Sequence, residues 1–285
     1  MSFPIAMIPY ANMAPYRELG APAGCTFVDL VPRQSIDALM GKKVWAAAVP
    51  VGGLAMLGER VRFLGKFGIA AKSRVMSVMF FSDRPFDEIR HPLTLSLTTE
   101  SASSVRLLYL LLGYRQGFEA MPLRPGKSLE QANGTLKIGD TALRWVWELE
   151  RKGSVQGYTH VTDLADRWFS RHGLPFVFAR WVIRRDAPRS LNDRFQDWLA
   201  QFKIREQQLI EQAVPGEAER LGLPRRRVDE YLHVIRRCLN PEDEAGQALF
   251  RSEFVHFARD PLFAEETREP GGPDAKDHIN GDERG

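Results

Sequence analysis

The chain lacks the residue patterns that mark the commonest cofactor and metal enzymes. It contains no glycine-rich nucleotide loop and no Gly-x-Ser-x-Gly elbow, so neither a dinucleotide site nor a serine hydrolase is indicated. Its six histidines are scattered, and no two have the spacing that holds a zinc ion. What remains for a site is hydroxyls, an amide, one carboxylate and backbone N–H groups. Such a site binds an anion and, if it catalyses, does so by orientation and electrostatics.

Cysteine is scarce, with only Cys25 and Cys238 among the 285 residues. The two lie far apart in the sequence and form no Cys-x-x-Cys motif. We predict that Cys25 lies in a strand and Cys238 in a helix, both as reduced, buried thiols of a cytoplasmic protein. A disulfide or a catalytic thiol is the less favoured alternative.

Long apolar runs are also absent. No run reaches membrane-spanning length, and residues 107–112 are assigned to an amphipathic helix instead. The sequence opens Met-Ser-Phe-Pro, without a basic region followed by a long apolar stretch, which argues against a signal peptide. We therefore expect a cytoplasmic protein with no membrane partner.

The charge balance excludes some partners and leaves others open. The formal net charge is +3, which is too small to indicate nucleic acid or an anionic membrane and is compatible with a small anionic ligand. The basic run at residues 225–227 is interpreted as the solvated start of a helix, and nucleic-acid binding is the less favoured alternative. Nothing in the sequence indicates the oligomeric state.

Strands alternate with helices throughout residues 4–184, which favours an α/β architecture. The pattern occurs as two runs that meet near Asp83 and Arg184, and this predicts two lobes with a ligand cleft between them. Lobe one is predicted at residues 1–83 plus 185–264, including the C-terminal helices, and lobe two at residues 84–184. Residues 265–285 contain glycine, proline and charge with almost nothing apolar, which predicts a disordered tail.

The individual elements follow from apolar periodicity and turn residues. The predicted strands are residues 4–10, 25–31, 44–49, 61–64, 75–81, 93–97, 120–123, 136–138 and 175–184, and the predicted helices are residues 16–19, 33–40, 52–58, 105–112, 128–133, 141–150, 162–172, 191–214, 225–239 and 246–258.

The strand-to-helix junction at residues 136–143 is the strongest local signal for a ligand site. Gly139 allows a close backbone turn, and Asp140 is a good N-cap residue, with Thr141 beside it. In an open α/β sheet, ligands collect where strand ends meet helix N-termini, because free N–H groups point there. The alternative is that Asp140 only caps the helix and contacts no ligand.

A second corner at residues 98–104 is rich in hydroxyl groups. Thr99, Ser101, Ser103 and Ser104 follow a predicted strand and precede a predicted helix. Hydroxyls together with helix N–H groups make a cradle for a carboxylate or a phosphate. A simple Ser/Thr cap would explain one or two of these hydroxyls but not all of them.

Two further polar residues, one after a predicted strand and one within another, are candidates for contact with a ligand. Asn12 follows the first strand, where a ligand-facing amide would be useful, and a turn or cap role is the alternative. Ser77 interrupts an apolar strand, and a hydrogen bond to a neighbouring backbone group is the favoured alternative there.

Taken in order, these segments resemble the MqnA family of chorismate dehydratases of menaquinone biosynthesis. The resemblance runs from about residue 5 to about residue 257, and it is specific as an ordered set rather than in any single piece. The matching segments are Asn12 with Ala14-Pro15, Ser77-Val78, residues 101–105, 138–143, 163–168, 173–179 and 218–224, and Tyr231-Leu232.

The resemblance implies a periplasmic-binding-protein-like fold of type II that is used inside the cell as an enzyme. It implies conversion of chorismate to 3-[(1-carboxyvinyl)oxy]benzoate with loss of water, the first step of the futalosine route to menaquinone. It implies no metal and no organic cofactor. Because chorismate is a dianion, two anion cradles are needed, and the Ser101 corner and the Asn12 loop are the candidates.

The proton acceptor is left between two groups. Asp140 is one candidate, and the other is the side-chain carboxylate of the substrate itself, held in place by Asn12. We favour the substrate carboxylate, because the aromatic product supplies much of the driving force and modest acid–base help suffices.

The sequence departs from the family pattern in two places. Residues 41–45 carry no acid where such folds commonly have Gly-x-x-Asp, and Gly52 and Gly53 stand where relatives tend to carry a bulkier residue. A more open site wall is expected there. The competing hypotheses are a non-catalytic binding protein for a small aromatic or cyclic carboxylate, and a related enzyme acting on a different aromatic substrate.

Overall fold

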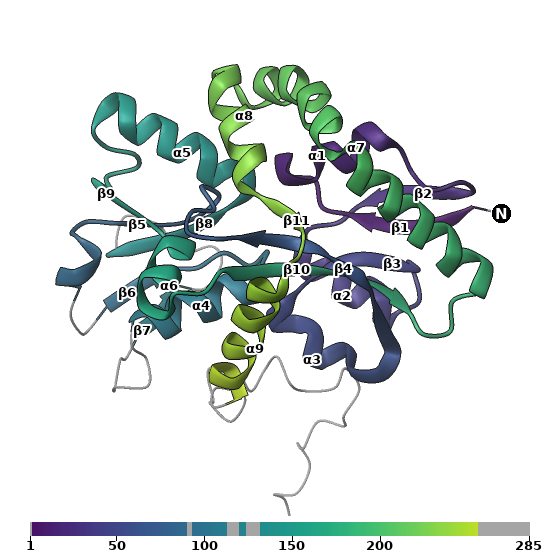
Figure 1. Cartoon of the computed structure of the whole chain (residues 1–285). Helices are drawn as coiled ribbons and strands as arrows, with labels where there is room; N and C mark the ends of the chain where they lie inside the picture. The colour runs from purple at the N-terminus through teal and green to yellow at the C-terminus, as the bar shows by residue number, and fades with distance from the viewer. Residues whose placement is uncertain (1, 90–92, 113–119, 124–131, 256–285) are drawn as a thin grey trace, which may run out of the picture.

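The computed structural model describes residues 2–89, 93–112, 120–123 and 132–255 of the chain. These residues form two β-sheets that lie side by side, each flanked by helices, with α5, α7 and α8 along one edge (Figure 1). The predicted two-lobed α/β fold is confirmed.

The first sheet has six strands in the order β11-β4-β10-β3-β1-β2. The sheet is mixed. The strands β3, β1 and β2 at one edge are parallel to one another, whereas β10 runs antiparallel to its neighbours β3 and β4. The strands are β1 (Phe3–Met7), β2 (Cys25–Asp29), β3 (Ala46–Pro50), β4 (Val61–Ala71), β10 (Phe176–Arg184) and β11 (Arg236–Cys238).

The second sheet has five strands in the order β7-β6-β8-β5-β9. Here β6 pairs in parallel with β7 and β8, and β5 runs antiparallel to β8 and β9. The strands are β5 (Val78–Ser82), β6 (Leu93–Ser96), β7 (Ala120–Leu123), β8 (Gly134–Ile138) and β9 (His160–Asp163).

Helices connect and cover the strands. The α-helices are α1 (Ala14–Leu19), α2 (Pro32–Met40), α3 (Leu54–Leu57), α4 (Ala102–Leu112), α5 (Gly139–Lys152), α6 (Leu164–His172), α7 (Arg189–Leu221), α8 (Arg225–Val234) and α9 (Pro241–Val255). The 3-10 turns are η1 (Ala11–Met13), η2 (Val51–Gly53), η3 (Gly58–Arg60) and η4 (Phe86–Glu88).

The chain crosses between the sheets earlier than predicted at both points. The strand predicted at residues 75–81 is β5 of the second sheet, and the strand predicted at residues 175–184 is β10 of the first sheet. The predicted lobe boundaries at residues 83 and 184 were therefore wrong by one strand each. An apolar run indicates that a strand is buried, but it carries no information on which sheet the strand joins.

Three local predictions were also wrong. β4 was predicted at residues 61–64, and it continues to Ala71 across the sheet. The helix predicted at residues 225–239 ends at Val234, and the chain then forms β11, so Cys238 lies in a strand. β9 was predicted as loop and helix start, because a four-residue strand has too few residues to show a period. Most of the helix predicted at residues 128–133 lies outside the described residues, as does the tail at 265–285.

Aromatic packing closes the second crossing between the sheets. The indole of Trp168 on α6 is fully buried and lies edge-on to Phe176 of β10 and Phe250 of α9. Its Nε1 donates a hydrogen bond of 3.2 Å to the carbonyl of Pro175, which ties the start of β10 to α6. This cluster holds an element of the second lobe against two elements of the first.

The corner between α7 and α8 ties the first lobe to α5 of the second lobe. Arg144 of α5 donates to the carbonyls of Arg220 and Leu221, the last residues of α7. Arg227 of α8 pairs with Glu150 of α5 through both guanidinium nitrogens. The lobes are therefore fastened along one edge of the cleft.

Both cysteines of the chain are free thiols. Within the described residues, no helix combines the length and the apolar character needed to cross a lipid bilayer.

Candidate functional site

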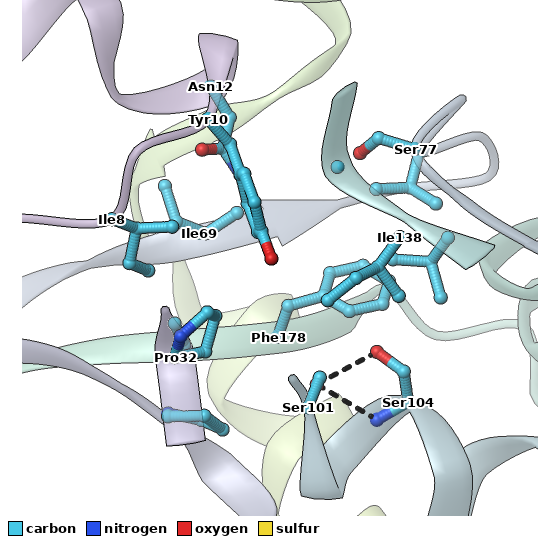
Figure 2. Close-up of a pocket in the computed structure, with 15 residues that line it drawn as sticks. Ile8, Tyr10, Asn12, Pro32, Ile69, Ser77, Ser101, Ser104, Ile138 and Phe178 are labelled. Atoms are coloured by element: carbon cyan, nitrogen blue, oxygen red, sulfur yellow. Dashed lines mark hydrogen bonds between the residues drawn. The ribbon is translucent and has the colours of Figure 1, made fainter. Parts of the chain in front are cut away.

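A pocket of about 470 Å³ lies between the two sheets (Figure 2). It draws residues from both lobes, which is the placement predicted for the ligand. Its lining consists of Ile8, Tyr10, Asn12, Pro32, Pro50, Ile69, Val75, Ser77, Val78, Ser101, Ser104, Ile138, Gly139, Phe178 and Ala179.

Two polar residues that follow β1 line this pocket, Tyr10 in the connecting loop and Asn12 in η1. The hydroxyl of Tyr10 and the side-chain oxygen of Asn12 are buried and make no hydrogen bond among the described residues. A buried polar atom without a partner is costly, so both groups are positioned to bind something that occupies the pocket. Figure 2 shows the Tyr10 hydroxyl between Asn12 at one end and the Ser101–Ser104 pair at the other.

Tyr10 is held in its neutral form. Burial raises the pKa of its hydroxyl well above the ordinary value of 10.0, and the nearby negative charge of Glu100 raises it further. The Glu100 carboxylate lies close enough to raise this pKa both through its charge and as a hydrogen-bond acceptor for the hydroxyl. Tyr10 is therefore a hydrogen-bond donor to a ligand rather than a base.

The hydroxyl-rich corner divides into groups that line the pocket and groups that do not. Ser101 precedes α4, and its Oγ accepts the N–H of Ser104 at 3.3 Å and lies 3.0 Å from the Ser104 Oγ. Both hydroxyls line the pocket. Ser103 instead accepts the N–H of Gly52 at 2.8 Å, and Thr99 is exposed outside the lining.

The expected open wall at Gly52 and Gly53 is absent. Both glycines are buried and neither lines the pocket. Gly52 is clamped against α4, because Ser103 accepts its N–H and Arg106 donates to its carbonyl at 2.6 Å. A Cβ at Gly52 would lie 3.0 Å from the Cα of Ser103, so glycine here permits lobe contact rather than opening the site.

Gly139 is required by the geometry of the junction between β8 and α5. Its φ of +58° lies in the left-handed region, and a Cβ there would lie 2.8 Å from the ring of Tyr10. Its N–H donates to the carbonyl of Ser77 at 2.8 Å. The glycine thus lets α5 begin directly against the pocket aromatic.

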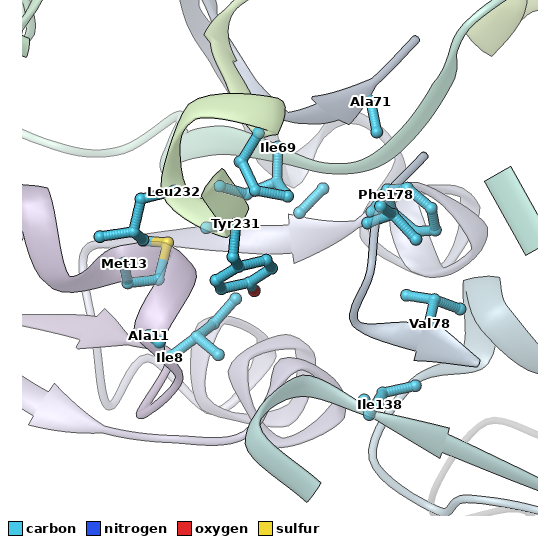
Figure 3. Packing of buried hydrophobic residues seen from close by; sticks show 14 of the residues in the cluster. Ile8, Ala11, Met13, Ile69, Ala71, Val78, Ile138, Phe178, Tyr231 and Leu232 are labelled. Carbon is cyan, nitrogen blue, oxygen red and sulfur yellow. The ribbon is translucent and has the colours of Figure 1, made fainter. Parts of the chain in front are cut away.

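Ser77 is held from behind by a buried tyrosine. The hydroxyl of Tyr231 on α8 donates to the Ser77 Oγ at 3.1 Å, and both side chains are buried. Figure 3 shows Tyr231 packed between Met13 and Leu232 on one side and Val78 and Ile138 on the other. The favoured interpretation of Ser77, a hydrogen bond between its hydroxyl and a neighbouring backbone group, was wrong, because the partner of the hydroxyl is the side chain of Tyr231.

Asp140 bridges the two lobes instead of capping α5. No side chain caps this helix, whose N-cap residue is Ile138. One carboxylate oxygen of Asp140 accepts the N–H of Ala11 at 2.9 Å, and the other accepts from Arg220 at 2.6 Å. The interpretation of Asp140 as a helix cap was wrong, because its side chain turns toward the Asn12 loop and α7.

The predicted site residues therefore fall into two groups. Five of them line the pocket together, namely Asn12, Ser77, Ser101, Ser104 and Gly139. Ser103 and Asp140 are buried but lie behind the lining, and Thr99 and Thr141 are exposed. Thr141 was predicted to be the first residue of the helix. In the structure it lies in the first turn of α5, on the side that faces solvent.

Sequence reasoning missed the aromatic and apolar part of the lining. Tyr10 and Phe178 were assigned only to strands, and Pro32 stands at the first position of α2. Tyr10 could have been found from its place two residues before Asn12, at the end of a strand. No comparable signal marks Phe178, which lies in a strand that is buried along its whole length.

The lining is well suited to an anion but contains no charged side chain. Among the described lining residues only Tyr10 is titratable, and the nearby Glu100 carboxylate acts on the Tyr10 hydroxyl from outside the lining. Pro32, Ser101 and Gly139 stand at the N-terminal ends of α2, α4 and α5. Three helix N-termini and two hydroxyls can hold negative charge without a metal or a cationic side chain.

Gly139→Ala should reduce stability and ligand binding more than Gly153→Ala. Gly153 ends the same helix with φ +76°, and a Cβ there meets nothing within 4 Å, so it reports backbone strain alone. Strain costs about 1–2 kcal/mol in each variant, and only Gly139→Ala also pushes the Tyr10 ring. Urea unfolding should give a larger loss for Gly139→Ala. Equal losses would show that the Tyr10 contact is unimportant.

Comparison with known proteins adds to this geometry. Residues 3–255 match the family model described as menaquinone biosynthesis. A chorismate dehydratase of Thermus thermophilus is 29% identical, over 89% of this chain and 95% of the relative.

Solved structures give the fold. A protein from Archaeoglobus fulgidus matches with a TM-score of 0.65 at 15% identity, over 90% of this chain and 97% of its own. The alkanesulfonate-binding protein of Xanthomonas axonopodis, bound to MOPS, matches with a TM-score of 0.60 at 13% identity, over 90% and 92%. The fold is that of periplasmic binding proteins. Because the family model spans most of the chain, the protein belongs to the menaquinone biosynthesis family, as the resemblance in its sequence predicted.

Proposed function

We propose that the protein is a chorismate dehydratase, a carbon–oxygen lyase that converts chorismate to 3-[(1-carboxyvinyl)oxy]benzoate and water. The reaction would be the first step of the futalosine route to menaquinone, carried out in the cytoplasm. The Thermus thermophilus relative and the family support this choice. The observation that carries it is the pocket, which joins anion-binding helix ends to the unpartnered Tyr10 hydroxyl and Asn12 oxygen.

The reaction needs little from the protein beyond orientation. The ring proton beside the enolpyruvyl ether leaves, the neighbouring hydroxyl departs with a proton as water, and the ring becomes aromatic. Aromatisation supplies driving force, so a positioned acceptor for the proton and a donor for the hydroxyl suffice. No oxidant and no cofactor enters the balance.

The pocket offers separate places for the two carboxylates of the substrate. Ser101 and Ser104 at the start of α4 form one anion cradle, and the loop that carries Asn12 forms the other. The two lie at opposite ends of the cavity, as Figure 2 shows. A dianion with well-separated charges fits this arrangement better than a monoanion.

The proposed proton acceptor is the side-chain carboxylate of the substrate. Asp140, the other candidate, is outside the lining, and both of its oxygens accept hydrogen bonds from Ala11 and Arg220. Taking the proton there would break the contact with Arg220 or Ala11. In this proposal the side-chain N–H of Asn12, not its oxygen, donates to the substrate carboxylate and orients it, and Tyr10, as a neutral phenol, donates to the departing hydroxyl.

The direct test follows chorismate and 3-[(1-carboxyvinyl)oxy]benzoate by chromatography, with an enzyme-free control because chorismate decays by itself. Wild-type protein should form product, and Asn12→Ala should lower kcat/KM by about 100-fold or more, as expected for loss of a positioned polar group. Stabilisation by chorismate without product would instead indicate a non-catalytic binding protein. If chorismate is neither converted nor able to stabilise the protein, chorismate is excluded as the ligand.

Asp140→Asn should retain measurable turnover. The substitution weakens the contact with Arg220, whose side chain is 42% exposed, so we expect a loss of about 1–2 kcal/mol in stability and a raised KM. Glu150→Gln is the matched control, because it removes the other carboxylate that pairs α5 with an arginine of the first lobe. A folded Asp140→Asn protein that binds chorismate but has no turnover would identify Asp140 as the base.

The pH profile provides a further check. Because the raised pKa keeps Tyr10 protonated and no other lining residue titrates, kcat/KM should be flat between about pH 6 and 9. It should fall only below about pH 5, where the substrate carboxylates begin to take up protons. A limb near pH 7 would require a titrating protein group that the lining does not contain.

A further inference from the structure

Arg237 is a fully buried charged side chain that lies outside the pocket lining. It lies on β11 with 0% of its surface exposed, although β11 is an edge strand. Its neighbour Arg236 faces the other side of the strand and pairs with Asp243 at 2.7 Å. Burying a guanidinium costs free energy, because the group loses its hydration. The contacts of Arg237 therefore contribute little net stability, and they indicate another role.

The contacts of Arg237 converge on the loop that carries Asn12. Its Nε donates to the backbone carbonyl of Asn12 at 3.1 Å, across a separation of 225 residues. Asn12 belongs to η1, a three-residue turn without a side-chain cap, so the turn has little internal support. The Arg237 contact fixes the peptide plane after Asn12 and thereby the direction of its side chain.

The same guanidinium also holds the end of α8. Its Nη1 donates to the carbonyls of Leu232 and Ile235 at 3.0 and 3.1 Å, and lies 3.3 Å from a carboxylate oxygen of Glu206 on α7. Leu232 follows Tyr231, whose hydroxyl donates to Ser77 in the pocket lining. One side chain therefore supports both Asn12 and the tyrosine behind Ser77.

We propose that Arg237 is a positioning residue that sets the orientation of Asn12 in the candidate site. The kinetic test of this proposal rests on the proposed function, because it measures turnover of chorismate. Arg237 does not line the pocket itself, and it acts through the Asn12 backbone. The planar guanidinium is essential. Its Nε and Nη1 donate to acceptors in separate segments of the chain, and the single ammonium nitrogen of a lysine cannot reach all of these acceptors.

The kinetic test uses Arg237→Lys, with Arg236→Lys as a matched control on the other face of β11. Arg237→Lys should lower kcat by about 10- to 100-fold with little change in KM, as expected when a reacting group is misplaced. In an Asn12→Ala background the same substitution should have a clearly smaller effect on kcat, because the part of its effect that acts through the Asn12 side chain is already lost. The proposal is overturned if Arg237→Lys lowers kcat by the same factor in both backgrounds, or if Arg237→Lys is fully active.

A second readout does not depend on turnover. The side-chain amide signal of Asn12 is assigned by NMR in the ligand-free protein from its absence in Asn12→Ala. It should shift or broaden in Arg237→Lys and remain in place in Arg236→Lys, with both variants folded by thermal unfolding. An unchanged Asn12 signal would overturn the positioning role. If the wild-type protein has no turnover but the Asn12 signal still shifts in Arg237→Lys, only the proposed reaction is wrong and the positioning role of Arg237 stands.

Discussion

The pocket depends on the buried carboxylate of Asp140. It comes from the second lobe, and both of its partners belong to the first, the N–H of Ala11 and the guanidinium of Arg220. This single group fixes the start of α5, the Asn12 loop and the end of α7 relative to one another. Removing either partner would leave charge buried without compensation, so the contact favours one relative position of the lobes.

If the proposed reaction is correct, that constraint lets a binding-protein fold act on its ligand although only Tyr10 among the described lining residues is titratable. The helix N-termini at Pro32, Ser101 and Gly139 provide positive potential from the backbone, and the fold fixes their direction. Groups held in this way need not reorganise during a reaction. In the proposed reaction a carboxylate of the substrate accepts the proton, and the protein holds the substrate in the reactive orientation. Arg237 extends the same principle, because it orients Asn12 through a carbonyl rather than by contact with the ligand.

Local sequence was sufficient for features that depend on neighbouring residues. The alternation of strands and helices predicted the α/β fold. The strand before Gly139 was predicted to end at Ile138, as it does, and the helix was predicted to begin two residues later than it does. Turn and cap chemistry works over a few residues, so the β8–α5 and β6–α4 corners could be found without a structure. Five of the predicted site residues meet in one pocket because the ends of strands in each sheet face the same cleft.

Features that depend on distant partners were decided only by the tertiary structure. The sheet joined by β5 and by β10, the turn of Asp140 toward Ala11 and the engagement of Ser103 by Gly52 all involve long separations in the chain. So does the burial of Tyr10 against Gly139. By itself the sequence determined the kinds of elements and the residues at their ends, because these follow from backbone preference and apolar period. The structure decided which of those residues face the ligand, because side-chain direction is set by packing between segments that no local pattern relates.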